Sequence, residues 1–177
     1  SNADTDDAFG IAVSMSADGK TLAVGAWGEA SNAGAAYVFV RAVDVWSEQA
    51  YVKASNTGAG DRFGVAIAVS ADGATLAVGA HQERGTDSGI GGDQFDNPAQ
   101  AIGATYVFVR SGSNWPQRAY VKASHSGSND LFGYAVAVSA DGNTLAVGAL
   151  GEDSEATGIS GEQVNSSAPD AGAVYLY

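Results

Sequence analysis

The side chains best able to bind a cation or a ligand in this sequence are carboxylates that recur at fixed spacing. Two positions carry them in triplicate: Glu29, Glu83 and Glu152 at one, and Asp7, Asp61 and Asp130 at the other. A carboxylate beside a turn commonly accepts hydrogen bonds from backbone amides. We therefore expect backbone bonding first, and as the alternative an electronegative surface for a cationic partner or for calcium.

Two oxygen-rich segments are the best candidates for a metal site. They comprise Asp87, Asp93 and Asp96 in one, and Glu152, Asp153 and Glu155 in the other. Calcium takes six to eight oxygen ligands, usually with several carboxylates, and neither segment has the spacing of an EF-hand loop. Calcium is the one cofactor that we consider, because zinc would need cysteines or paired histidines, which the sequence does not have.

One repeated position carries three different side chains, Trp27, His81 and Leu150, and is free to serve a ligand. Trp27 either packs on a neighbouring loop or stacks on a sugar ring. His81 and His125 are lone histidines, and we expect them at the surface. The candidate ligand-binding residues are Trp27, Glu29, His81, Glu83 and Glu152.

Composition narrows the function classes. Among 177 residues, 20 are acidic and 8 are Lys or Arg, so a net charge of −12 disfavours nucleic acid and anionic membranes as partners. No apolar run reaches the length of a membrane helix, so membrane insertion is not expected. We find no nucleophile paired with a base and no Gly-x-Ser-x-Gly elbow in the context that motif needs, so an enzyme is not expected. Ser1-Asn2-Ala3 is typical of a cleaved expression tag.

The chain repeats itself three times. Phe-Gly pairs begin at Phe9, Phe63 and Phe132, and each leads into Ser-Ala-Asp-Gly and then Thr-Leu-Ala-Val-Gly-Ala. The intervals are 54 and 69 residues, and the difference lies in one loop. Such a period indicates a repeat architecture. The repeats cover about residues 9–54, 63–123 and 132–177 of a single segment, 4–177.

Each repeat predicts antiparallel strands. Phe63, Val65 and Ile67 alternate with Gly and Ala, so one face is large and the other small, and both are expected to be buried. The Asp-Gly pairs that follow predict two-residue hairpin turns. Four strands per repeat describe a propeller blade. The fold class is all-β, with three four-stranded blades, the third lacking its last strand, in a ring that is incomplete alone.

The turns of a blade alternate between two rims. We expect the Asp-Gly turns and the Trp46 and Trp115 segments on one rim. The other, which we call the long-loop rim, comprises residues 26–33, 55–62, 80–102, 124–131 and 149–171. The two longest loops match each other at an offset of 69, which predicts ordered loops with Ile90 and Ile159 tucked in.

The repeat resembles the FG-GAP family, the propeller blades of integrin α-subunits and of many bacterial surface proteins. Phe-Gly, Val-Gly-Ala and Ala-Gly-Ala-Val-Tyr or Gly-Ala-Thr-Tyr recur in order over nearly the whole chain. Many members carry a calcium loop, Asp-x-Asn-x-Asp-Gly-x-x-Asp, between the first two strands. Ser-Ala-Asp-Gly stands there instead, with one carboxylate, so that calcium role is not transferred to the turns.

The resemblance implies a non-catalytic binding or adhesion module of a cell-surface or secreted bacterial protein, extracellular or periplasmic, that recognises its ligand through the acidic long-loop rim. A carbohydrate-binding propeller and a purely structural repeat array are the alternatives, so the ligand is a protein or a glycan. Open blade edges invite pairing. We therefore expect either a homo-oligomer or the remainder of a longer chain to complete the propeller.

Overall fold

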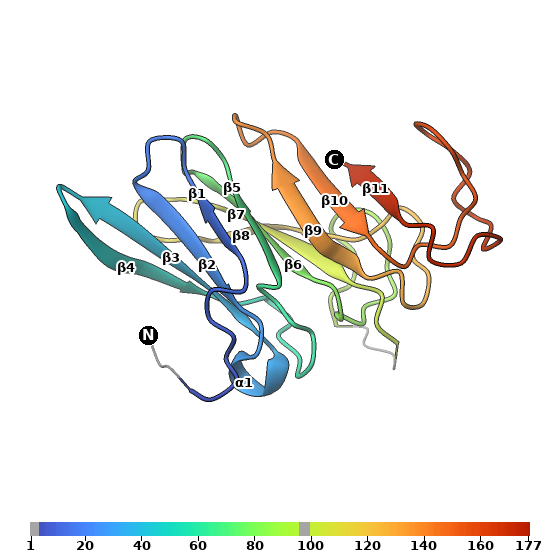
Figure 1. Ribbon diagram of the computed structural model, residues 1–177, viewed down its shortest axis with the longest axis horizontal. Coiled ribbons are helices and arrows are strands. Elements are labelled where there is room, and N and C mark those ends of the chain that lie inside the picture. The colour runs from blue at the N-terminus through green and yellow to red at the C-terminus, as the bar shows by residue number, and fades with distance from the viewer. Residues whose placement is uncertain (1–3, 96–99) are drawn as a thin grey trace.

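The computed structural model describes residues 4–95 and 100–177, which form three antiparallel sheets side by side (Figure 1). The first sheet runs β1 (Val13–Met15), β2 (Thr21–Ala26), β3 (Ala35–Ala42), β4 (Val45–Val52). The second runs β5 (Ala66–Val69), β6 (Thr75–Ala80), β7 (Ala104–Val109), β8 (Gln117–Val121). The third runs β9 (Phe132–Val138), β10 (Leu145–Ala149), β11 (Ala173–Leu176).

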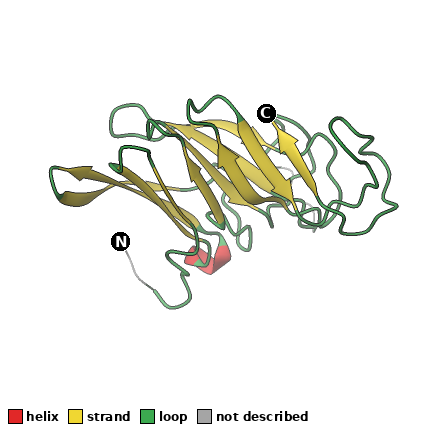
Figure 2. Cartoon of the chain, turned by 45° about the horizontal axis from the view of Figure 1, so that its top comes forward, coloured by secondary structure: helices red, strands yellow, loops and turns green. Residues whose placement is uncertain are grey.

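These sheets confirm the predicted fold class. They are blades of four, four and three strands, which do not close into a ring, and each is a simple meander of sequence neighbours. We call them blades 1, 2 and 3. The one helix of the described residues, α1 (Glu29–Asn32), is a short turn in which Ala30 and Ser31 have φ angles of 53° and 62° (Figure 2). No helix in the described ranges is long and apolar enough to span a membrane.

Neighbouring blades pack a large face against a small one. Phe63 and Ile67 of blade 2 share a core with Ala23, Ala36 and Val38 of blade 1. The contact is close enough that a Cβ on Gly25 would overlap the carbonyl oxygen of Gly64, and one on Gly79 would overlap that of Gly133. The alternation of large and small side chains therefore sets how closely the blades approach.

The two end faces differ from these buried faces. In blade 1 the large face is open, and Phe9 and Val13 are 52% and 64% exposed. In blade 3 the small face is open, and Val174 and Leu176 are largely exposed. The prediction that both faces of every blade are buried is therefore wrong at the two ends, because no blade lies beyond them among the described residues.

The hairpin between the first two strands of each blade is longer than the predicted two-residue turn. Its backbone pairs Ser16 with Thr21, and the equivalent bonds recur in the other blades. The Ser16 hydroxyl donates to Asp18 at 2.7 Å and accepts from the Thr21 amide at 2.9 Å, while Gly19 takes a φ of 65°. The single carboxylate of this turn therefore holds the hairpin.

Candidate functional site

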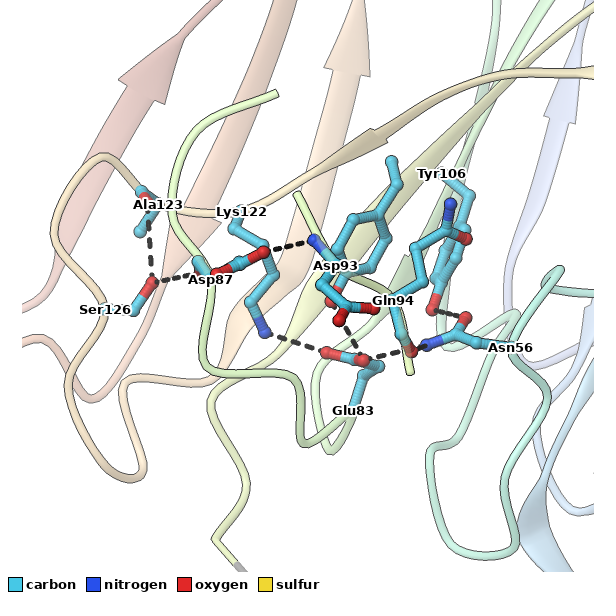
Figure 3. A network of polar contacts seen from close by, with 10 residues as sticks. Asn56, Glu83, Asp87, Asp93, Gln94, Tyr106, Lys122, Ala123 and Ser126 are labelled. Carbon is cyan, nitrogen blue, oxygen red and sulfur yellow. Dashed lines mark hydrogen bonds and ion pairs between the residues drawn. The ribbon is translucent and has the colours of Figure 1, made fainter. Parts of the chain in front are cut away.

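The repeated glutamate is a buried anchor of the blade. Glu83 is 2% exposed. Its Oε2 lies 2.8 Å from Lys122 Nζ, and its Oε1 accepts from the Tyr120 hydroxyl at 2.9 Å and from the Asn56 side-chain amide at 3.0 Å (Figure 3). Lys122 and Tyr120 both belong to the fourth-strand segment, so Glu83 attaches that strand to the loop after β6.

Burial dominates the electrostatics of this cluster. Lys122 is fully buried, and desolvation lowers its pKa while Glu83 opposes that shift. The pKa of Tyr120 is raised well above its ordinary value by desolvation and then by the charge of Glu83. A buried ion pair with hydrogen bonds to both carboxylate oxygens satisfies its own charges. It leaves Glu83 without an exposed surface for a ligand.

The same position differs in the other two blades. Glu29 accepts from the hydroxyls of Tyr37, at 2.6 Å, and of Tyr51, while Lys53 donates to the Gly34 carbonyl at 2.7 Å. Glu152 is also buried. It accepts from the amide and hydroxyl of Ser154, at 3.1 and 2.8 Å, both on Oε2.

The second recurring carboxylate bonds to the backbone, as predicted. Asp61 accepts from the Gly58 amide at 2.8 Å, and Asp130 accepts from the Gly127 amide at 2.6 Å. Burial raises the pKa of Asp61 to about 6 and also raises that of Asp130. These residues fix the connections between blades.

The side chain at the variable position is half-buried as Trp27, buried as His81 and exposed as Leu150. Arg62 lies over the ring of Trp27, at 4.7 Å from its centroid, so one face of the indole is covered. His81 is 5% exposed and packs edge-on against Tyr134, so its predicted surface placement is wrong. Burial, with a smaller contribution from the Arg62 charge, lowers the pKa of His81 to about 4. Leu150 is 52% exposed.

The loop carboxylates hold their own loops together. Asp87 accepts from the Asp93 amide (Figure 3). Asp93 in turn accepts from the Phe95 amide at 2.9 Å. Asp153 accepts from the Asp170 amide at 2.8 Å, and the Glu155 amide donates to Asn165. Within residues 4–95 and 100–177 no three such side chains converge on one point. Asp96 lies outside the described residues, and the calcium hypothesis stays a prediction.

The sequence did not predict that the long loop of blade 2 pairs with a strand of its own blade. Its segment 89–91 pairs with the outer edge of β8, through Lys122 N to Gly89 O at 2.8 Å and Gly91 N to Tyr120 O at 2.9 Å. Ile90 is 64% exposed and Ile159 is 96% exposed, so the prediction that they are tucked in is wrong. The similarity of the two loops at an offset of 69 correctly predicted an ordered loop in blade 2, but it did not show that the order comes from backbone pairing with β8.

The FG-GAP repeat model matches this chain over residues 1–39, 46–108 and 115–177. This match agrees with the repeated sequence motifs and with the three meanders of the structure. The chain belongs to the FG-GAP repeat family. The matched FG-GAP units straddle the blades, because 46–108 contains nearly all of β4 of blade 1 together with β5, β6 and nearly all of β7 of blade 2. Successive FG-GAP units are therefore interlocked through the fourth strand.

Other comparisons bear on the fold alone. Hydrazine synthase of Kuenenia stuttgartiensis is similar in structure, with a TM-score of 0.52 and 17% sequence identity. The similarity covers 88% of this FG-GAP chain and 33% of the synthase chain, so this chain spans about a third of that protein. No curated protein sequence matches this chain.

Proposed function

We propose that this FG-GAP segment is a non-catalytic binding module of a cell-surface or secreted bacterial protein, and that it recognises a protein partner through the long-loop rim. The repeated glutamates and aspartates are engaged inside the blades. Recognition therefore falls to exposed side chains of the two longest loops.

The observation that carries this proposal is a set of large apolar side chains in acidic loops. Phe95 is 79% exposed and Val164 is 67% exposed. Exposed apolar side chains with a polar rim are characteristic of protein interfaces. Asp93 beside Phe95, and Glu162 beside Val164, favour a partner that offers cationic groups around an apolar contact.

The described parts of the loops that carry these side chains make internal hydrogen bonds. Asn165 accepts from the Glu155 amide at 3.1 Å and from the Ser167 hydroxyl at 2.8 Å. The Asn56 side chain donates to the Gln94 carbonyl at 2.8 Å. A loop that is ordered before binding loses less entropy when it binds. The hydrogen bonds within these loops therefore support a role in recognition over a role as passive connections between strands.

A peptide selection tests the proposal. A phage-displayed random peptide library is selected on the immobilised chain, and enriched clones are assayed on a Phe95→Ser/Val164→Ser variant and on Val43→Ser. Val43 is 93% exposed at the β3–β4 turn, so it is a matched apolar control on the opposite rim. We expect clones with aromatic and basic residues whose binding weakens at least tenfold in the rim variant and is unchanged in Val43→Ser.

Two outcomes of this selection would contradict the proposal. No enrichment, or clones that bind the rim variant as well as the wild type, would contradict recognition through this rim. The same proteins on a glycan array separate the carbohydrate alternative, since glycan binding that is lost in Trp27→Ala would favour it. The covered face of Trp27 disfavours that outcome.

A further inference from the structure

Two blades present the same outer edge, and a loop covers it in only one of them. β4 and β8 are the outer strands of blades 1 and 2. Their edges share the sequence Ala-Tyr-Val-Lys-Ala-Ser, at residues 50–55 and 119–124. The connection between β6 and β7 spans residues 81–103 and reaches the edge of β8. The connection between β2 and β3 spans only residues 27–34, so blade 1 has no such loop.

In blade 2 the cover is a short Gly-x-Gly segment. Lys122 donates its amide to the Gly89 carbonyl at 2.8 Å, and the Gly91 amide donates to the Tyr120 carbonyl at 2.9 Å. Ile90 between them is 64% exposed, so its side chain adds little to the contact. Gly89 and Gly91 have φ angles of 75° and 78°, a left-handed conformation that L side chains disfavour. This edge therefore accepts a Gly-x-Gly segment through backbone bonds.

In blade 1 the equivalent backbone groups are open. Tyr51 and Lys53 follow β3 in the register that Tyr120 and Lys122 follow along β7. Because bonding directions alternate along an antiparallel strand, the Tyr51 carbonyl and the Lys53 amide point away from β3. Among the described residues, no backbone group pairs with either of them. The edge that receives the loop in blade 2 is therefore available in blade 1.

A groove of about 450 Å³ follows this open edge. Residues 49–53 form one wall of it, and such a consecutive run is expected where a groove follows the backbone, because side chains alternate between the two faces of a strand. The other wall belongs to blade 2 and includes Trp115 and Gln117. Trp115 donates its indole N–H to Gln49 at 3.0 Å, and the Ser55 amide donates to Gln117 at 3.1 Å. Both walls are thus fixed to each other.

We propose that this groove binds an extended Gly-x-Gly segment of a separate polypeptide. The Lys53 amide donates to the carbonyl of the first glycine, and the amide of the second glycine donates to the Tyr51 carbonyl, as segment 89–91 bonds to blade 2. Backbone bonds give such strand addition its affinity. The net charge of −12 favours an uncharged or basic segment over an acidic one. Phe95 and Val164 do not line the groove, so this binding does not rest on the proposed function.

An NMR titration tests the proposal on the full chain. The ¹⁵N-labelled protein is titrated with acetyl-Ser-Gly-Ile-Gly-Gly-amide, the sequence of residues 88–92. We expect a saturable shift of the Lys53 amide resonance. The Lys122 amide is the internal control, because its edge is already covered, and it is expected not to shift. Before peptide is added, hydrogen exchange is expected to be at least tenfold faster at Lys53 than at Lys122.

Two further peptides test the left-handed conformation. They carry either D-alanine or L-alanine at the two positions of Gly89 and Gly91, so their compositions are the same. D-alanine favours positive φ, whereas L-alanine disfavours it. An added Cβ at either glycine of the loop has no neighbour within 4 Å, so a loss with L-alanine reports conformation rather than a clash. The D-alanine peptide is expected to retain binding, and the L-alanine peptide to bind at least tenfold more weakly.

Two substitutions at one position separate the backbone from the side chain. Lys53→Pro removes the amide that faces the groove, and an edge strand tolerates proline where its amide does not pair within the sheet. This variant is expected to lose the response of the Tyr51 amide to the peptide. Lys53→Ala keeps the backbone amide and is expected to bind as the wild type does.

The proposal is overturned by any of three results. These are no saturable response at millimolar peptide, equal binding of the D-alanine and L-alanine peptides, or equal hydrogen exchange at Lys53 and Lys122 before peptide is added. The last result would show that the edge is already covered. A response confined to the side-chain amides of Asn114 and Gln117 would also overturn it, in favour of a site for a small polar ligand.

Discussion

At the scale of single residues, this chain uses its recurring carboxylates for internal bonding. The buried pair of Glu83 and Lys122 is stable only because both oxygens and the ammonium group have partners. A Glu or Lys residue is almost never fully buried unless it is paired. The recurrence of Glu29, Glu83 and Glu152 thus reflects a shared structural task, which differs in detail from blade to blade.

Removal of Glu83 is expected to destabilise the chain strongly. Glu83→Ala leaves the Lys122 charge buried without its counterion, which typically costs about 3 to 5 kcal/mol. Urea unfolding followed by circular dichroism measures the loss. The double variant Glu83→Ala/Lys122→Met is expected to recover part of it, because no buried charge remains. A Glu83→Ala loss no larger than that of a substitution at the exposed Glu155 would contradict this role.

His81 is expected to make stability depend on pH. Burial lowers its pKa to about 4 in the folded chain, whereas the unfolded value is about 6.5. The unfolded state therefore binds more protons between these values, and the free energy of unfolding falls as the pH drops from about 6.5 to 4. The full loss is about 3 kcal/mol. Asp61, whose pKa is raised to about 6, acts in the opposite direction over a similar range.

The comparison that isolates His81 is with His81→Leu, since blade 3 carries Leu150 at the same position. The wild type is expected to lose stability relative to His81→Leu as the pH falls, in urea unfolding at a series of pH values. Parallel profiles for the two proteins would contradict a buried neutral histidine.

At the scale of elements, the blade interface depends on a glycine in the second strand. Gly79→Ala would place a Cβ against the Gly133 carbonyl oxygen, so we expect a loss of about 2 kcal/mol or more in unfolding free energy. Gly148 occupies the same repeat position in blade 3. The nearest atom to a Cβ added there is the Cβ of Ala135, at 3.4 Å. Gly148→Ala is therefore the matched control, with little expected change in the isolated chain. Equal losses in the two variants would show that blade contact is not the reason for this glycine.

The strands were predictable from the sequence because alternation and repetition agree. The large and small faces of Phe63, Val65 and Ile67, and the repeat of Thr-Leu-Ala-Val-Gly-Ala, indicated three similar meanders. The local bonding of Asp61 and Asp130 was also predictable, since it depends on neighbours in sequence. The fold was predictable because the same short-range alternation of large and small side chains occurs in every repeat.

The burial of the candidate site was less predictable. The bonds to Glu83 come from Lys122 and Tyr120, 39 and 37 residues away, and from Asn56 of the preceding connection. Charge and position alone do not indicate such contacts. The prediction that His81 lies at the surface was wrong for the same reason. Its burial depends on contact with Tyr134 in the next blade. Pairing between distant strands decides what each side chain contacts.

At the scale of the whole molecule, the two end faces are complementary. Blade 1 exposes a large face with Phe9, Val13 and Met15, and blade 3 exposes a small face around Gly148. Inside the chain such faces pack on each other and bury aromatic and aliphatic side chains. We therefore expect, as a prediction, that the large face of one copy can pack on the small face of another, and two copies joined at both ends would place six blades in a closed ring.

Charges on the large face are expected to prevent this association. Val13→Lys/Met15→Lys adds two ammonium groups where the equivalent face of blade 2 is packed against a neighbour. Sedimentation velocity is expected to show a smaller species for this variant than for the wild type. An equivalent double substitution at Val43 and Val45, on the exposed hairpin, is expected to leave the sedimentation coefficient unchanged.

The most direct test of blade-face packing between copies is the absolute mass of the wild-type chain, measured by light scattering after size exclusion over a range of concentrations. The chain has a mass of 17.7 kDa. A species of twice that mass, lost in Val13→Lys/Met15→Lys, is the expected result. A single species of 17.7 kDa at every concentration would contradict the claim that an exposed large face requires a small face as its partner.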